Sequence, residues 1–313
     1  MKGTSPSLRH QCALILIIII SSQTCFSQLS LKLGMYEAGF TMAPSNFLGD
    51  LGGNPGKGGT LLKDNNLSNT KLLVGAHINL FPTEWYAIRF ALNYGTIAGD
   101  DALIKGKGGE EEARIVRNLN FKSKIYEALA GVEFYPTVFL ESYPSDHEHK
   151  IRPYIVAGIG AFQFNPLGHD EVTGEWVKLK QLHTEGEGFP EYPNRKNYSL
   201  KQINIPLGIG IKYFLSETVS ISGEMLLRKT FTDYIDDVST TYIDKDLFYK
   251  HLSLESAIVA VRMYDKSTSS TNRNAGEMRG KSSNKDSYYS AGLKISVLLK
   301  NVTNLRYMRC PKI

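Results

Sequence analysis

The sequence predicts an all-β protein: an eight-stranded antiparallel up-and-down transmembrane β-barrel of the outer-membrane type. Three observations support this. Apolar and polar residues alternate over segments of about ten residues, the length of a tilted strand that crosses a membrane. Short turns alternate with long polar links along the chain. The long apolar run near the N-terminus, 13–20, is too short to cross a membrane as a helix.

The first 27 residues are predicted to be a signal peptide. Lys2 and Arg9 precede the apolar run, and small residues lead to a cleavage site after Ser27. This leader removes two of the 36 basic residues and none of the 31 acidic ones, which lowers the formal charge from +5 to +3. So mild a charge argues against nucleic acid as a partner. One cysteine, Cys310, remains in the exported chain, which excludes an internal disulfide.

The clearest strand is 203–214, where the odd positions are aliphatic and end in Tyr213, and the even positions are small or polar except Phe214. A period of two is that of a strand, since a helix would mix the two sets. The same alternation, weaker in the first, fourth and fifth segments, predicts strands over 33–42, 70–81, 85–96, 121–135, 151–164, 219–231 and 288–299.

The links between these strands differ in length in a regular way. Short or moderate turns are expected at 82–84, 136–150 and 216–218, and long polar links at 43–69, 97–120, 165–200 and 232–287. Outer-membrane barrels have short periplasmic turns and long outer loops. The predicted organisation is therefore a signal peptide over 1–27, a barrel with four long outer loops over 28–299, and a basic C-terminal tail over 300–313.

The polar face of the strands carries charges of both signs. Because an eight-stranded barrel has room inside only for side chains, buried charges there must pair. We expect a salt-bridged plug, with a narrow proton or ion path as the alternative. Its members are Glu37, Lys71, His77, Arg89, Glu127, Glu133, Arg152, Lys212, Glu224, Arg228 and Lys294. A soluble lipocalin-like barrel, the competing architecture, would place the apolar face inside.

Several stretches are similar to those of a known group of proteins. They are 45–53, 134–136, 152–154, 205–213 and 231–239. On these residues the chain resembles small outer-membrane barrels of unknown function from Bacteroidetes-type bacteria, among them PorG-like barrels of the type IX secretion and gliding machinery. The resemblance implies a structural or secretion-machinery subunit, with secretion-machinery proteins as partners. The chain departs from the pattern at its end, where barrels usually stop on an aromatic residue and this one continues over 300–313.

No motif predicts catalysis, a cofactor or a metal site. The glycine-rich stretch 49–60 lacks the spacing of a phosphate loop, so no nucleotide partner is expected. His147 and His149 are expected in a solvated turn. Asp233, Asp236 and Asp237 predict a structured rim that fixes the last long loop, in preference to a calcium site.

The function expected from the sequence is therefore non-catalytic and exerted through the loops and turns. The expected partners are outer-membrane lipid and, during biogenesis, the barrel assembly machinery. The alternative function is a lipid-modifying enzyme of the outer membrane, for which His183, Glu185 and Ser199 are the candidate residues.

Overall fold

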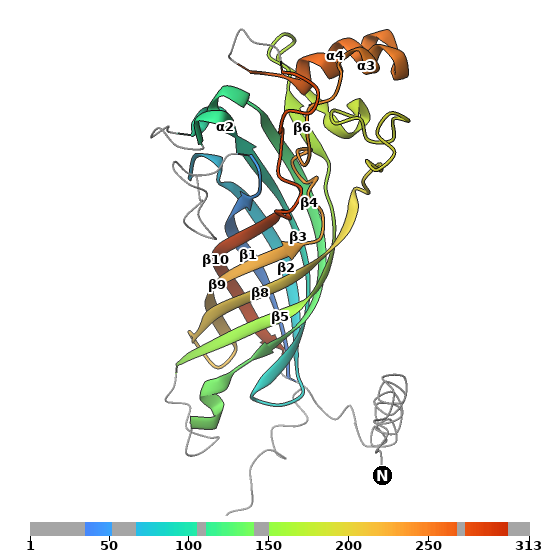
Figure 1. Cartoon of the computed structure of the whole chain (residues 1–313). Helices are drawn as coiled ribbons and strands as arrows, with labels where there is room; N and C mark the ends of the chain where they lie inside the picture. The colour runs from blue at the N-terminus through green and yellow to red at the C-terminus, as the bar shows by residue number, and fades with distance from the viewer. Residues whose placement is uncertain (1–34, 52–66, 105–110, 141–149, 268–272, 300–313) are drawn as a thin grey trace, which may run out of the picture. The chain divides into compact units, whose positions relative to one another are not determined.

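A computed structural model describes residues 35–51, 67–104, 111–140, 150–267 and 273–299 (Figure 1). The predicted signal peptide at 1–27 and the predicted tail at 300–313 lie outside these ranges, as do His147 and His149. None of the helices in the described ranges is both long and apolar enough to cross a membrane.

Eight strands close into an antiparallel barrel. Each strand pairs with the barrel strand that precedes and follows it in the chain, and the last strand returns to pair with the first. This confirms the predicted fold class. The strands are β1 (Met35–Leu48), β2 (Lys71–Phe81), β3 (Tyr86–Asp100), β4 (Asn120–Phe134), β5 (Ile151–Gln163), β8 (Lys201–Phe214), β9 (Val219–Thr230) and β10 (Ser287–Leu299).

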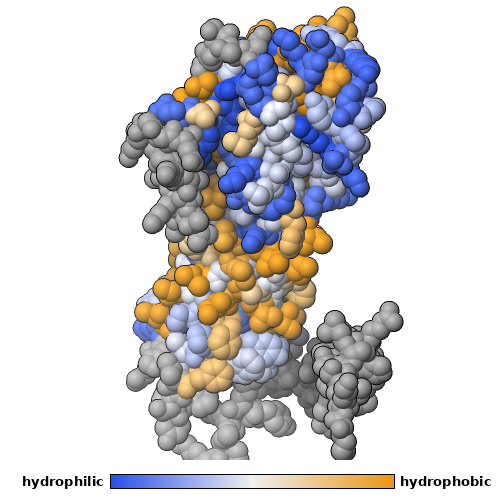
Figure 2. Space-filling model, viewed as in Figure 1, coloured by the Kyte–Doolittle hydropathy of each residue, from blue (hydrophilic) through white to orange (hydrophobic). Residues whose placement is uncertain are grey.

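The two faces of the barrel wall have opposite polarity. On β8 the outward Ile209 is 64% exposed, whereas the inward Lys212 is 1% exposed. Strand pairing keeps this alternation in register, since Ile209 faces Ile155 of β5 and Met225 of β9. Figure 2 shows the resulting band of apolar side chains on the outside of the barrel. Outer-membrane barrels carry such a band where they meet lipid.

The long links fold into a cap at one end of the barrel (Figure 1). We define the cap as the described parts of these links: 49–51, 67–70, 101–104, 111–119, 164–200, 231–267 and 273–286. Its elements are η3 (Leu67–Asn69), η4 (Asp101–Leu103), α2 (Glu111–Arg117), β6 (Pro166–His169), β7 (Trp176–Lys178), η6 (Leu179–Leu182), α3 (Asp246–His251) and α4 (Leu254–Tyr264). The opposite end, the turn end, carries the short turns and η5 (Pro136–Leu140).

The cap has a hydrophobic core of its own. Helix α4 is capped at its N-terminus by Ser253, whose hydroxyl accepts a hydrogen bond from the backbone N–H of Ser256. Its buried residues recur at helical spacing, and Ala257, Ala260 and Tyr264 pack into the main buried cluster. The hairpin β6–β7 pairs through β6 with the cap end of β4 and so continues the barrel wall into the cap. The described parts of the links, which we predicted from the sequence only as long and polar, thus form a folded structure.

Candidate functional site

Charged side chains from strands all around the barrel meet inside it. The central cluster, near the turn end, contains three carboxylates and three cations, so its formal charge is balanced. Its members are Glu37, Glu133, Glu224, Arg89, Lys212 and Lys294, and the side chains of all six are at most 8% exposed.

Glu133 lies at the middle of the central cluster. Its carboxylate accepts hydrogen bonds from Arg89, from Lys294 at 3.3 Å and from the hydroxyl of Tyr135. Arg89 also reaches across the barrel, where its guanidinium donates two hydrogen bonds to Glu224, at 3.0 and 2.5 Å. Such two-pronged contacts fix geometry as well as charge. The cluster therefore ties strands together that are not neighbours in the wall.

The remaining carboxylate of the central cluster is held in the same way. Lys212 Nζ lies 2.8 Å from Glu37 Oε2 and donates to the Tyr135 hydroxyl at 3.0 Å. Asn79 donates to both Glu37 and Glu133 at 3.0 Å. Buried charges that are both paired and hydrogen bonded avoid the large cost of desolvation.

A second cluster lies on the cap side of the first. Arg228 Nε donates to Glu127 at 3.0 Å, and the same carboxylate accepts hydrogen bonds from Asn93, Asn204 and Tyr288. This second cluster has one negative and one positive charge, so its formal charge is balanced as well. Both clusters are therefore neutral by internal pairing.

An apolar layer is found between the two clusters. Leu129, Val156 and Leu226, each 4% exposed or less, pack together there. Leu129 lies on β4 between Glu127 and Glu133, and Leu226 lies on β9 between Glu224 and Arg228. An ion would have to leave one set of partners, pass an apolar layer and disrupt the second set. The described interior is thus filled by paired charges and apolar side chains, which is the arrangement expected of a plug.

Three predicted members, Lys71, Arg152 and His77, are not among the residues of the two clusters. Lys71 is exposed, because it is the first residue of β2 and lies at the cap-side mouth of the barrel. Arg152 is half-buried near the start of β5, at the turn end, where its guanidinium lies 5.8 Å from the ring centroid of Phe214. His77 is buried in the interior and its Nε2 lies 3.0 Å from the hydroxyl of Ser296. The mouths of the barrel, unlike its middle, leave charges near solvent.

Uncharged partners of the plug were missed by sequence reasoning, which considered only charges. Tyr154 donates to Glu224 at 2.7 Å and lies against Gly210, where a Cβ atom would be 2.3 Å from the tyrosine Cζ. An inward tyrosine paired in register with a glycine was the available signal. The glycines were expected to make room for long charged chains, and Gly210 instead makes room for this tyrosine.

The predicted loop rim lies in the cap, with all three carboxyl groups buried. Asp233 accepts a hydrogen bond from the hydroxyl of Ser239 at 2.7 Å. Asp236 accepts one from the backbone N–H of Leu51 at 3.2 Å. Asp237, which has a φ of 65°, accepts one from the hydroxyl of Tyr198 at 2.5 Å. These bonds tie the last long loop to two other segments of the cap.

Further acids surround this rim, and burial together with like charge raises the pKa values of the group. Burial raises the pKa of Asp233 to about 7 and that of Asp237 to about 6. Burial, with Asp50 nearby, raises the pKa of Asp236 well above its usual value. Burial raises the pKa of Glu187 to about 8, with Asp237 as the next cause. Part of this group is therefore protonated near neutral pH.

The three residues considered for a lipid-modifying enzyme, His183, Glu185 and Ser199, all lie in the described part of the cap. His183 Nδ1 donates to the carbonyl oxygen of Glu187 at 2.6 Å, Ser199 Oγ donates to the carbonyl oxygen of Lys201 at 3.0 Å, and Glu185 pairs with Arg279 at 3.0 Å. These three residues thus each have other partners. Within the described ranges, no group of three or more His, Cys, Asp or Glu side chains could hold a metal ion.

A comparison with protein families gives one match. A model described as a domain of unknown function, DUF6089, matches residues 10–255. The chain belongs to the DUF6089 family. The match spans β1 to β9 and includes the two carboxylates of the plug that lie on β4. No curated protein matches this DUF6089 chain in a sequence search.

Solved structures similar to the DUF6089 chain are small barrels of low sequence identity. The outer membrane protein OprG of Pseudomonas aeruginosa is 9% identical, with a TM-score of 0.37 over 85% of this chain and 96% of that one. Ail of Yersinia pestis is 9% identical, with a TM-score of 0.35 over 85% and 99%. Outer Membrane Protein W of E. coli is 10% identical, with a TM-score of 0.34 over 86% and 100%.

Proposed function

We propose that the protein is a non-catalytic barrel of the outer membrane, exported by its signal peptide, which acts through its cap and its turns. We propose further that it is a structural or secretion-machinery subunit of the type IX and gliding kind. The observation that carries this proposal is the plug. A barrel whose interior is filled by paired charges and an apolar layer offers its two ends, and not its lumen, for function.

The membrane location is supported by the inverted polarity of the wall. Phe40, Leu92 and Ile209 are 75%, 68% and 64% exposed and belong to a band that encircles the barrel. A continuous apolar surface of this kind is insoluble in water and matches the hydrocarbon layer of a membrane.

The cap supplies a surface for protein partners. On helices α3 and α4, Tyr249, Leu254 and Ile258 are 50%, 71% and 43% exposed, although the helices rest on the cap core. Exposed apolar side chains on an ordered scaffold favour protein contacts. The hydrogen bond between Leu51 and Asp236 joins two of the stretches that carry the PorG-like resemblance, 45–53 and 231–239. These stretches thus help to build the cap that we assign to partner binding.

The test combines fractionation with site-specific crosslinking in cells. A photo-crosslinking amino acid replaces Leu254 in the cap or Glu217 in an exposed turn at the other end, and a third variant carries it at the buried Leu226 as a control. We expect the protein in the detergent-extracted outer membrane, with secretion-machinery proteins crosslinked from position 254 or 217 and none from 226. Recovery in the soluble periplasm would contradict the membrane location. Crosslinks to no secretion protein from either exposed position would contradict the secretion role.

A further inference from the structure

Charges on the outward face of the barrel strands are confined to one end. Among the outward positions of the described strands, the charged residues all lie at the cap end, and four of the five are lysines: Lys122, Lys124, Lys201, Lys229 and Asp100. At the turn end the outward positions of these strands are uncharged, and four of them are aromatic: Tyr36, Tyr86, Phe134 and Tyr213. The barrel is therefore electrically asymmetric along its axis.

We call Lys122, Lys124, Lys201 and Lys229 the lysine belt. These lysines are available to a ligand. Lys124, Lys201 and Lys229 are exposed, and their ammonium groups form no ion pair with any residue in the described ranges. Lys122 Nζ lies 3.7 Å from the ring centroid of Trp176, which directs it along the outer surface. The cations of the two interior clusters are paired with carboxylates, whereas the lysines of the belt form no such pair with any described residue.

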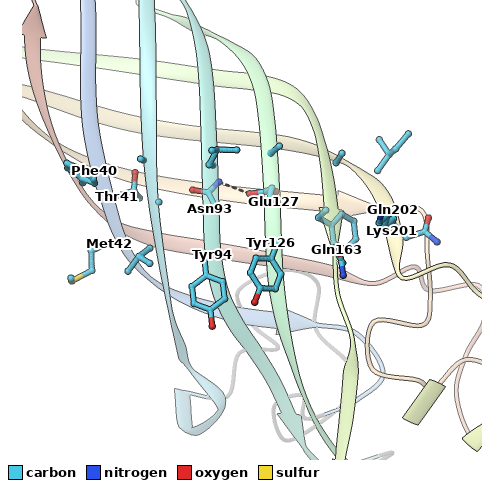
Figure 3. Close-up of a pocket in the computed structure, with 18 of the residues that line it drawn as sticks. Phe40, Thr41, Met42, Asn93, Tyr94, Tyr126, Glu127, Gln163, Lys201 and Gln202 are labelled. Carbon is cyan, nitrogen blue, oxygen red and sulfur yellow. Dashed lines mark hydrogen bonds between the residues drawn. The ribbon is translucent and has the colours of Figure 1, made fainter. Parts of the chain in front are cut away.

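A hollow of about 1410 Å³ follows the outer surface of the barrel (Figure 3). Its lining comes from β10, β1, β2, β3, β4, β5 and β8, and Lys201 is the lysine of the belt that lines it. Ala128 of β4 and Ala161 of β5 are opposite each other on neighbouring strands, and both line the hollow. The rings of Tyr94 and Tyr126 lie 5.0 Å apart at its edge, and Lys201 lines it as well. This hollow exceeds the roughly 300 to 1,000 Å³ of ordinary ligand pockets, and its lining is mostly apolar.

We propose that this face binds a phosphorylated glycolipid of the outer leaflet, of the lipid A class. The lysines of the belt contact its phosphates, and its acyl chains occupy the hollow beside Ala128 and Ala161. The inference rests on the proposed location in the outer membrane. Positive charge next to a large apolar hollow matches a ligand with phosphates next to several acyl chains. A second copy of the chain fits less well, because a two-fold interface on this face would bring lysines against lysines.

The experiment uses the purified, folded full chain and native mass spectrometry. The barrel is titrated with diphosphorylated hexa-acyl lipid A, with its dephosphorylated form and with phosphatidylethanolamine. We expect the barrel to bind the diphosphorylated form at least tenfold more tightly than the dephosphorylated one. Replacing both Lys124 and Lys201 by Gln should reduce this preference to less than threefold. The matched control is Lys150→Gln, which removes a lysine from the turn end and should leave the preference unchanged.

A second pair of variants tests the hollow. Ala128→Leu with Ala161→Leu fills it and should weaken binding of both lipid A forms at least fivefold, whereas Ala157→Leu, also outward on β5 but outside the hollow, should not. Each variant is first shown to migrate as a folded barrel in unheated gels. Equal binding of the two lipid A forms by the unmodified protein would overturn the proposal. Equal effects of Lys150→Gln and the belt variant, or effects on dimer content alone, would overturn it too. These results do not depend on whether a secretion partner exists.

Discussion

The plug makes a sharp prediction about Glu133. Its carboxylate is fully buried and is contacted by Arg89, Lys294, Asn79 and Tyr135. Glu133→Gln keeps the shape but leaves two carboxylates against three cations in the central cluster. Removing one partner of a buried pair costs about 3 to 5 kcal/mol, because a charge stays buried without compensation. We expect a loss of that size in the free energy of unfolding.

The excess charge, and not the lost shape, should cause most of this loss. Glu133→Gln combined with Lys294→Met restores the balance, with Glu37 and Glu224 facing Arg89 and Lys212. We expect the double variant to lose less than about 2 kcal/mol, so that the two substitutions are strongly non-additive. The control, Glu217→Gln in an exposed turn, should stay within about 0.5 kcal/mol of the unmodified protein.

The assay is urea unfolding in lipid vesicles, followed by the fluorescence of Trp85 and Trp176. Both variants and the control are measured under the same conditions, and the extrapolated free energies are compared. A double variant that is no more stable than Glu133→Gln would refute the reasoning, since charge balance would then not matter. A single variant within 0.5 kcal/mol of the unmodified protein would show that the interior is hydrated.

Three further predictions follow from the wall and the cap. Ile209→Arg should lower the stability of the barrel in vesicles by about 2 to 4 kcal/mol, and Ile209→Val by less than about 1, because position 209 faces lipid. Gly210→Ala should displace the Tyr154 ring and destabilise the folded barrel in urea, and an unchanged midpoint would contradict this close contact. For Asp233, the pKa rises from 3.8 to about 7 on folding, so its contribution to stability is complete below pH 4 and is lost as the pH rises to about 7. Asp233→Asn should therefore slow hydrogen exchange in the cap at pH 8 and leave the exchange rate nearly unchanged at pH 4. At 1.36 kcal/mol per pKa unit, the gain in stability at pH 8 is at most about 4 kcal/mol.

The barrel wall could be predicted because lipid and plug impose opposite polarity on alternate residues. Strand β10 was expected over 288–299 and spans Ser287–Leu299. The prediction for β3 ended at 96, whereas the strand continues to Asp100. Ile97 and Ala98 are neighbours in sequence and both are buried, because the cap covers both faces of the strand there. Alternation then ceases to indicate the strand.

The cap could not be predicted in the same way, because its core is assembled from distant segments. Phe121, Phe164, Tyr242 and Phe248 belong to one buried cluster, yet more than 120 residues separate the first from the last. Helix α4 was not predicted either, although the spacing of its apolar residues and the N-cap residue Ser253 are visible in the sequence. The pairing of the plug was also beyond sequence reasoning, which supplied the inward face but not the partner of each charge.

The retention of charges in the interior calls for a reason other than stability. Well-packed apolar residues can replace buried ion pairs without loss of stability. An apolar interior, however, would give each strand two similar faces, and a slip of one residue would then carry little penalty. Here such a slip would turn Arg89 toward lipid, at a cost of about 2 to 4 kcal/mol, and would separate it from Glu224, its partner across the barrel. We infer that the plug selects the register of the strands, which explains why its ion pairs join β3 to β9 and β8 to β1 across the interior.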